Sequence, residues 1–119
     1  MAAAGSTSTN PTLSIQDRKS GIRHLVDSGA AVCVTPASAK ERRRRPSTTL
    51  TAANGSPIRT WGTRNISVHV GKRTFTHTVF LADVTRSILG ADFFVANNLA
   101  IDLRGRRLID MSDASVLAV

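Results

Sequence analysis

The residues best suited to chemistry in this chain are the tripeptide Asp27-Ser28-Gly29, which directly follows the apolar pair Leu25-Val26. An apolar strand would bring the carboxylate inward, and a serine and a glycine after it favour a tight turn. Two carboxylates that share one proton can act on a water molecule as general base and general acid. No other aspartate of the chain begins a second Asp-Ser-Gly. This chemistry would therefore need one Asp27 from each chain of a symmetric dimer.

An Asp-Ser-Gly tripeptide is also an ordinary turn in many proteins, so its neighbours decide the interpretation. Downstream lies the segment 87–94, SILGADFF, in which an apolar pair and a glycine precede a helix start. Between the two lies the turn-rich segment 54–62, NGSPIRTWG. With these three motifs in this order, the sequence resembles the retropepsins, the dimeric aspartic proteases of retroviruses and LTR retrotransposons. It is most similar to the protease segment of a gypsy-type Gag-Pol polyprotein, and the resemblance covers 13–110.

The resemblance implies a fold class and an activity. The fold would be mainly β, a small closed antiparallel β-barrel with one short C-terminal helix. The activity would be that of an aspartic endopeptidase, a homodimer that processes a polyprotein substrate without any cofactor. Asp27 of each chain would activate a water molecule, and Ser28 would brace the loop. The implied catalytic residues are Asp27, Ser28 and Gly29, and the implied substrate-binding residues are Ala30 and the flap residues Asn54, Gly55 and Ser56.

Several positions depart from the usual gypsy-type pattern. His24 stands where an aromatic residue is usual, Ala31 where an acidic residue is frequent, Thr35 where an aliphatic residue precedes proline, and Trp61 where tyrosine is usual. None of these positions belongs to the Asp-Ser-Gly tripeptide, so they leave the catalytic chemistry open. The alternative function is a non-catalytic dimerisation or binding module from a degenerate or domesticated retroelement.

The net charge of +8 raises the question of a nucleic-acid partner. Much of the charge lies in the run Arg42, Arg43, Arg44 and Arg45. A solvated loop is the simpler interpretation, because base-specific recognition needs more than an arginine run. The sequence also lacks interleaved aromatic residues that could stack on single strands. We expect at most weak, non-specific nucleic-acid binding through these four arginines.

Composition bounds the location and the metal chemistry. No apolar stretch approaches the length of a membrane span, and residues 1–9 lack the charged flank and apolar centre of a secretory signal, so we expect an intracellular protein. Cys33 is the only cysteine, which excludes an internal disulfide framework, and we expect a buried, inert thiol rather than a nucleophile. His77 alternates with apolar residues and is expected at the edge of the core. No second ligand follows at metal-binding spacing, so we assign no metal.

The pattern of apolar and turn residues predicts the elements that position Asp27. We expect a disordered tail over 1–11, one protease-like domain over 12–111 and a C-terminal tail over 112–119. The segments 13–16 and 22–26 should form a hairpin that ends at the catalytic loop. A helical turn is expected at 35–40 and one helix over 91–98. Further strands are expected over 30–34, 48–53, 58–61, 65–70, 75–81, 88–90, 100–103 and 107–109.

Overall fold

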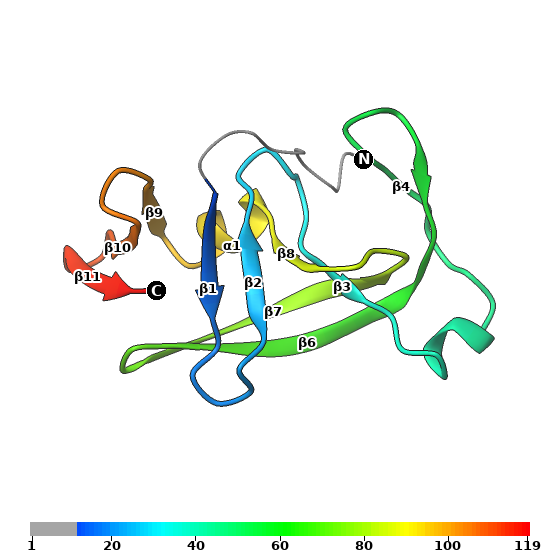
Figure 1. Ribbon diagram of the computed structural model, residues 1–119, viewed down its shortest axis with the longest axis horizontal. Helices are drawn as coiled ribbons and strands as arrows, with labels where there is room; N and C mark the ends of the chain where they lie inside the picture. The colour runs from blue at the N-terminus through cyan, green and yellow to red at the C-terminus, as the bar shows by residue number, and fades with distance from the viewer. Residues whose placement is uncertain (1–11) are drawn as a thin grey trace.

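The computed structural model describes residues 12–119, so the tail predicted over 1–11 lies outside the described residues. Strands are the main regular structure of the described chain, which also has a 3-10 helix at Glu41–Arg43 and the α-helix α1 at Ala91–Ala96 (Figure 1). The strands are β1 (Leu13–Gln16), β2 (Arg23–Val26), β3 (Val34–Pro36), β4 (Leu50–Thr51), β5 (Pro57–Ile58), β6 (Thr60–Val70), β7 (Arg73–Ala82), β8 (Ser87–Leu89), β9 (Leu99–Asp102), β10 (Arg107–Asp110) and β11 (Ser115–Ala118).

The strands form three sheets. The largest has six strands in the order β1-β2-β8-β3-β7-β6. Its pairs β2/β8 and β3/β7 are parallel, and its other neighbours are antiparallel. A three-stranded sheet β11-β10-β9 lies at the left of Figure 1. Strands β4 and β5 form a two-stranded hairpin at the right. The mainly β class with one short helix is thus confirmed.

The closed antiparallel barrel predicted from the resemblance is wrong, because the sheets are open. Strands β1 and β6 stand at opposite ends of the six-stranded order. The two come together past the end of β1, where the Arg18 amide donates to the His69 carbonyl at 2.9 Å. A contact beyond the strand end is not a ladder of paired strands, so the sheet has two edges and includes parallel as well as antiparallel pairs.

Alternating apolar residues explain why the sheet folds around one main core. In β1, Leu13 and Ile15 are buried while Gln16 faces solvent. The same period places Phe75 and Val79 of β7 in the core cluster. Helix α1 adds Phe93, which is fully buried and meets Phe75 edge to face at 6.1 Å between ring centroids. The hairpin predicted for 13–16 and 22–26 is present as the antiparallel pair β1/β2, and the strands predicted over 100–103 and 107–109 pair as β9 and β10.

Two local predictions need correction. The strand expected over 30–34 begins only at Val34, because residues 30–32 turn sharply after the Asp27 loop. The helical turn expected at 35–40 lies at Glu41–Arg43 instead. Its start is a capping box: the Ser38 amide donates to Glu41 Oε1 at 2.7 Å, and the Glu41 amide donates to Ser38 Oγ at 3.1 Å. In the segment 112–119, residues Ser115–Ala118 form β11, paired with β10.

Candidate functional site

Asp27 lies where β2 leaves the six-stranded sheet. Residues 24–26 of β2 pair in parallel with residues 87–89 of β8. The Asp27 amide continues this pairing by donating to the Leu89 carbonyl at 3.0 Å. The Ala30 amide then donates to the Asp27 carbonyl at 3.1 Å and closes the turn. The apolar strand and the turn predicted from the sequence therefore hold the carboxylate at a fixed place on the sheet.

The two carboxylate oxygens of Asp27 have different surroundings. Oδ1 accepts a hydrogen bond of 3.0 Å from the Gly29 amide, and a Cβ on Gly29 would lie only 3.2 Å from it. Oδ2 is buried and has no hydrogen-bond partner among the described residues. A buried carboxylate oxygen without a donor is costly and calls for an explanation. Ser28 is exposed, and its hydroxyl makes no hydrogen bond within residues 12–119.

Gly90 lies where two backbone segments approach closely. A Cβ on Gly90 would lie 2.6 Å from the Val32 carbonyl oxygen and 2.8 Å from the Ala30 carbonyl oxygen, both backbone atoms that cannot swing away. Next to it, the Ala91 amide donates to the Ala30 carbonyl at 2.7 Å. Gly90 and Ala91 thus hold the Asp27 loop in place through backbone contacts, and those at Gly90 leave no room for a side chain.

Ala30, which the sequence assigned to substrate binding, is a floor residue of the loop. Its side chain is 1 % exposed, and both its amide and its carbonyl are hydrogen-bonded within the loop and to Ala91. It belongs to a second apolar cluster that also contains Leu50 and Ile58, from the two arms of the β4/β5 hairpin. The hairpin base is therefore packed onto the same cluster as the loop floor.

The other predicted substrate-binding residues, Asn54, Gly55 and Ser56, form the exposed tip of this hairpin. The Ser56 amide donates to Asn54 Oδ1 at 2.9 Å, and Gly55 has a φ of +87°, which favours glycine. The Asp27 loop and the β4 hairpin both lie along the upper edge of Figure 1. The hairpin predicted to act as a flap is therefore present, and the three residues of its polar tip are exposed.

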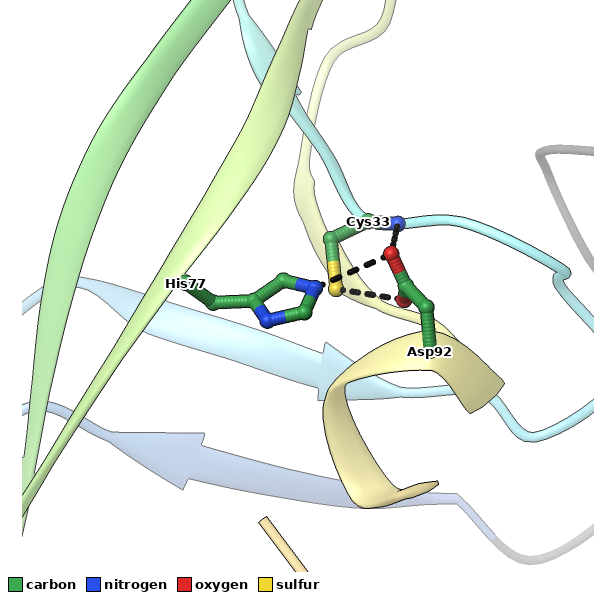
Figure 2. Close-up of side chains that lie close together, drawn as sticks. All are labelled: Cys33, His77 and Asp92. Atoms are coloured by element: carbon green, nitrogen blue, oxygen red, sulfur yellow. Dashed lines mark hydrogen bonds and ion pairs between the residues drawn. The ribbon is translucent and has the colours of Figure 1, made fainter. Parts of the chain in front are cut away.

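Three potential metal ligands that were not expected together lie close to one another, as Figure 2 shows: Cys33, His77 and Asp92. Cys33 Sγ donates to Asp92 Oδ1 at 3.1 Å, and His77 Nε2 lies 3.0 Å from Asp92 Oδ2. Cys33 is fully buried, as predicted. Burial raises the pKa of its thiol, and the hydrogen bond to Asp92 raises it further. The cluster could not be predicted because its three residues lie far apart in the sequence, although the strand face of His77 and the helix start at Asp92 were both predicted.

All four arginines of the run are exposed, and one of them is held by an ion pair. Arg42 makes an ion pair of 2.6 Å with Asp83, and its guanidinium carbon lies 5.1 Å from the Trp61 ring centroid. Arg43, Arg44 and Arg45 are exposed and form no ion pair within residues 12–119. The structure thus leaves three of the four cations available to solvent. Within the described part of the chain, no helix is both long and apolar enough to cross a bilayer.

No protein-family profile matches the sequence, and no curated protein matches it. Solved structures do. The retroviral protease-like domain of Ddi1 from Leishmania major is 15% identical, with a TM-score of 0.64 over 94% of each chain. EIAV protease, solved in complex with the inhibitor HBY-793, is 20% identical, with a TM-score of 0.54 over 79% of this chain and 93% of that one. The chain therefore has the fold of retroviral protease-like domains.

Proposed function

We propose that this chain is an aspartic endopeptidase that acts as a homodimer, with Asp27 of each chain at the symmetry axis. The observation that carries the proposal is the buried, unpartnered Oδ2 of Asp27. A second carboxyl group with a shared proton would supply the hydrogen bond that this oxygen lacks. The likeness to two retroviral protease-like structures supports the same interpretation at the level of the fold.

In the proposed mechanism, the two Asp27 side chains hold one proton between them and titrate as a pair. The ionised carboxylate takes a proton from a water molecule, and the protonated one polarises the carbonyl of the scissile peptide bond. Water adds to the carbonyl carbon to give a tetrahedral diol. Collapse of the diol breaks the C–N bond as a proton passes to the leaving amine. Both products leave without a covalent acyl-enzyme.

The surrounding residues would support and cover this site. Gly29 and Gly90 fix the loop, because each lies where a Cβ would press on Asp27 or on the loop backbone. Asn54, Gly55 and Ser56 would close over an extended peptide, which pairs with strand edges through main-chain hydrogen bonds. Ala30 would form the floor. The substrate that we propose is a polyprotein of a gypsy-type retroelement.

The test is proteolysis of an unfolded protein substrate from mildly acidic to neutral pH, by wild-type protein and by Asp27→Asn. We expect cleavage by the wild type and a loss of about 1,000-fold or more in the variant. Asp83→Asn is the matched control, because it removes a surface carboxylate and should cleave normally. Analytical ultracentrifugation establishes whether the sample is dimeric. A folded, dimeric wild type that cleaves nothing would refute the enzyme.

A second candidate function is a non-catalytic dimerisation or binding module with the same fold. The exposure of Ser28, whose hydroxyl makes no hydrogen bond within residues 12–119, favours a partner chain at the loop whether or not catalysis follows. Under this alternative the dimer forms, but neither the wild type nor Asp27→Asn cleaves the substrate. The same samples therefore separate the two functions.

Weak, non-specific nucleic-acid binding is a subsidiary proposal, and it rests on the three exposed arginines Arg43, Arg44 and Arg45. Phosphate contacts of this kind weaken steeply as salt rises, because binding releases counterions. Replacing all three by glutamine should reduce both the affinity for single-stranded RNA and the slope of its salt dependence. An unchanged affinity would remove this partner.

A further inference from the structure

We propose that Cys33, His77 and Asp92 form a zinc site that ties the Asp27-bearing half of the sheet to helix α1. The three residues come from three elements: the turn before β3, the middle of β7 and the first turn of α1. One donor atom from each lies within 4.8 Å of the other two. In Figure 2 all three side chains point toward a common centre.

The distances suit a tetrahedral ion after small side-chain shifts. Ligand atoms around one Zn²⁺ lie about 3.3–3.8 Å apart, given zinc–ligand bonds of about 2.0–2.3 Å. Here Sγ of Cys33 lies 3.1 Å from Asp92 Oδ1, and Nε2 of His77 lies 3.0 Å from Asp92 Oδ2. Asp92 lies between the other two donors, so an ion would replace the hydrogen bonds that it now makes to them. A thiolate, an imidazole and a carboxylate form a donor set that zinc favours.

Charge and burial support the same ion. Cys33 is 0% exposed, whereas the side chains of His77 and Asp92 are 15% and 30% exposed. Zinc bound to one thiolate and one carboxylate is a neutral centre, which is far less costly to bury than a free thiolate. The exposed side of His77 and Asp92 leaves room for water as the fourth ligand. On binding, the S–H bond of Cys33 breaks, the thiolate S⁻ bonds to Zn²⁺, and one proton passes to solvent.

Neighbouring groups already hold the ligands in place. The Gly90 amide donates to Cys33 Sγ at 3.2 Å, a contact that stabilises charge on the sulfur. The Phe93 amide donates to Asp92 Oδ1 at 2.8 Å. The His77 ring meets the Phe93 ring edge to face, with centroids 5.6 Å apart. Each ligand thus has a supporting contact besides those it makes to the other two, which is how proteins orient metal ligands.

The first experiment is a Co²⁺ titration of the full chain, free of any affinity tag, monitored by absorption. Residues 1–11 contain no histidine, cysteine or carboxylate side chain, so the tail adds no competing ligand. We expect one Co²⁺ per chain, a near-ultraviolet thiolate-to-cobalt charge-transfer band, and loss of this band when Zn²⁺ is added. Cys33→Ser should abolish the band, and Asp92→Asn should weaken binding about 10-fold or more.

His69→Gln is the matched control for His77→Gln. Both histidines have side chains 15% exposed, and both bond to an aspartate, Asp17 for His69 and Asp92 for His77. Only His77→Gln should lose metal binding. The same samples, shown to be folded by circular dichroism, are then melted with and without Zn²⁺, which should raise the Tm of the wild type by several degrees.

Two results would overturn the zinc site. One is a folded wild type that shows no thiolate–cobalt band. The other is an equal Zn²⁺-induced rise in Tm for wild type and Cys33→Ser. Repeating the titration with Asp27→Asn excludes the proposed catalytic carboxylates as the binding site, because this variant should bind Co²⁺ like the wild type. Neither measurement depends on proteolysis, so the zinc site is tested independently of the proposed enzyme activity.

Discussion

Two aspartates at the ends of one hairpin have opposite surroundings. Asp17 follows β1 at the turn, is 2% exposed, and accepts hydrogen bonds from the Lys19 amide, the Ser20 amide, and the His69 amide and ring. Asp27 follows β2 at the open end, where Oδ1 accepts one bond and the buried Oδ2 accepts none within residues 12–119. One carboxylate is fully satisfied by its own chain, and the other keeps one buried oxygen without a donor among the described residues.

The difference separates a structural carboxylate from a candidate catalytic one. Burial raises the pKa of Asp17, but hydrogen bonds from Ser20 and His69 outweigh burial and hold it below its usual range. Asp17 is thus kept ionised to join the β1–β2 turn to β6. A carboxylate with this many internal donors has no capacity left for substrate, whereas Asp27 keeps an oxygen free.

The largest effect on stability is expected for Asp17→Asn. Asparagine places an NH₂ group where Asp17 now accepts hydrogen bonds, so buried amides lose their acceptor. We expect a loss of about 3 kcal/mol in the free energy of unfolding, measured by urea denaturation. The activity per folded molecule should stay at the wild-type level. A variant as stable as the wild type would show that the hydrogen bonds of Asp17 contribute nothing.

A smaller loss is expected for Gly90→Ala, which tests the support of the Asp27 loop. The new Cβ would press on the carbonyl oxygens of Val32 and Ala30, and we expect a cost of about 2 kcal/mol. Gly105→Ala is the control, because its Cβ would meet only the side chains of Asp102 and Arg107, which can move. Equal stabilities for the two variants in urea would contradict the close backbone packing at Gly90.

The sequence predicted the path of the chain to Asp27 better than the pairing of the strands. The hairpin of 13–16 with 22–26 and the strands over 65–70 and 75–81 depend on patterns among neighbouring residues, and these were confirmed. The parallel pairing of β2 with β8 depends on which distant strands meet, which no local pattern encodes. The closed barrel was wrong for the same reason: the edges of a sheet depend on all of its strands together.

The candidate site was predictable where local chemistry decides it. The Asp-Ser-Gly turn and the glycine of SILG could be identified, since each needs a particular residue type. The capping box of Ser38 and Glu41 could also have been found from its spacing, and it would have moved the predicted helical turn to its true place. The cluster of Cys33, His77 and Asp92 could not, because folding alone brings these residues together.

The pH dependence of stability sharpens the comparison further. The folded pKa of Asp17 lies below the unfolded value of about 3.9. The ionised Asp17 therefore makes its full contribution to the free energy of unfolding at pH values above about 3.9. The contribution is lost as pH falls through the folded pKa. The stability gap between wild type and Asp17→Asn should therefore be largest near neutral pH and shrink below about pH 4. Urea unfolding from pH 7 to 2.5 measures it, and a gap constant with pH would contradict the assignment.

The smallest effect is expected for Asp27→Asn on the stability of the folded chain. Oδ2 has no internal partner to lose, so the change in the free energy of unfolding should stay within about 0.5 kcal/mol. The measurement is made at concentrations low enough to keep the chain monomeric. A loss as large as that of Asp17→Asn would show that Asp27 is a second structural carboxylate and would remove the contrast.

The contacts at Gly90 also set the order in which the molecule can be assembled. The Asp27 loop is held by Leu89, Gly90 and Ala91, which follow it by about half the length of the chain. Contacts between segments so far apart form late in folding, because the intervening chain must first be ordered. On the ribosome, residues 27–30 emerge well before their support is synthesised. Asp27 is therefore synthesised before the residues that fix its loop, and the loop can take its final geometry only once the last third of the chain has been made.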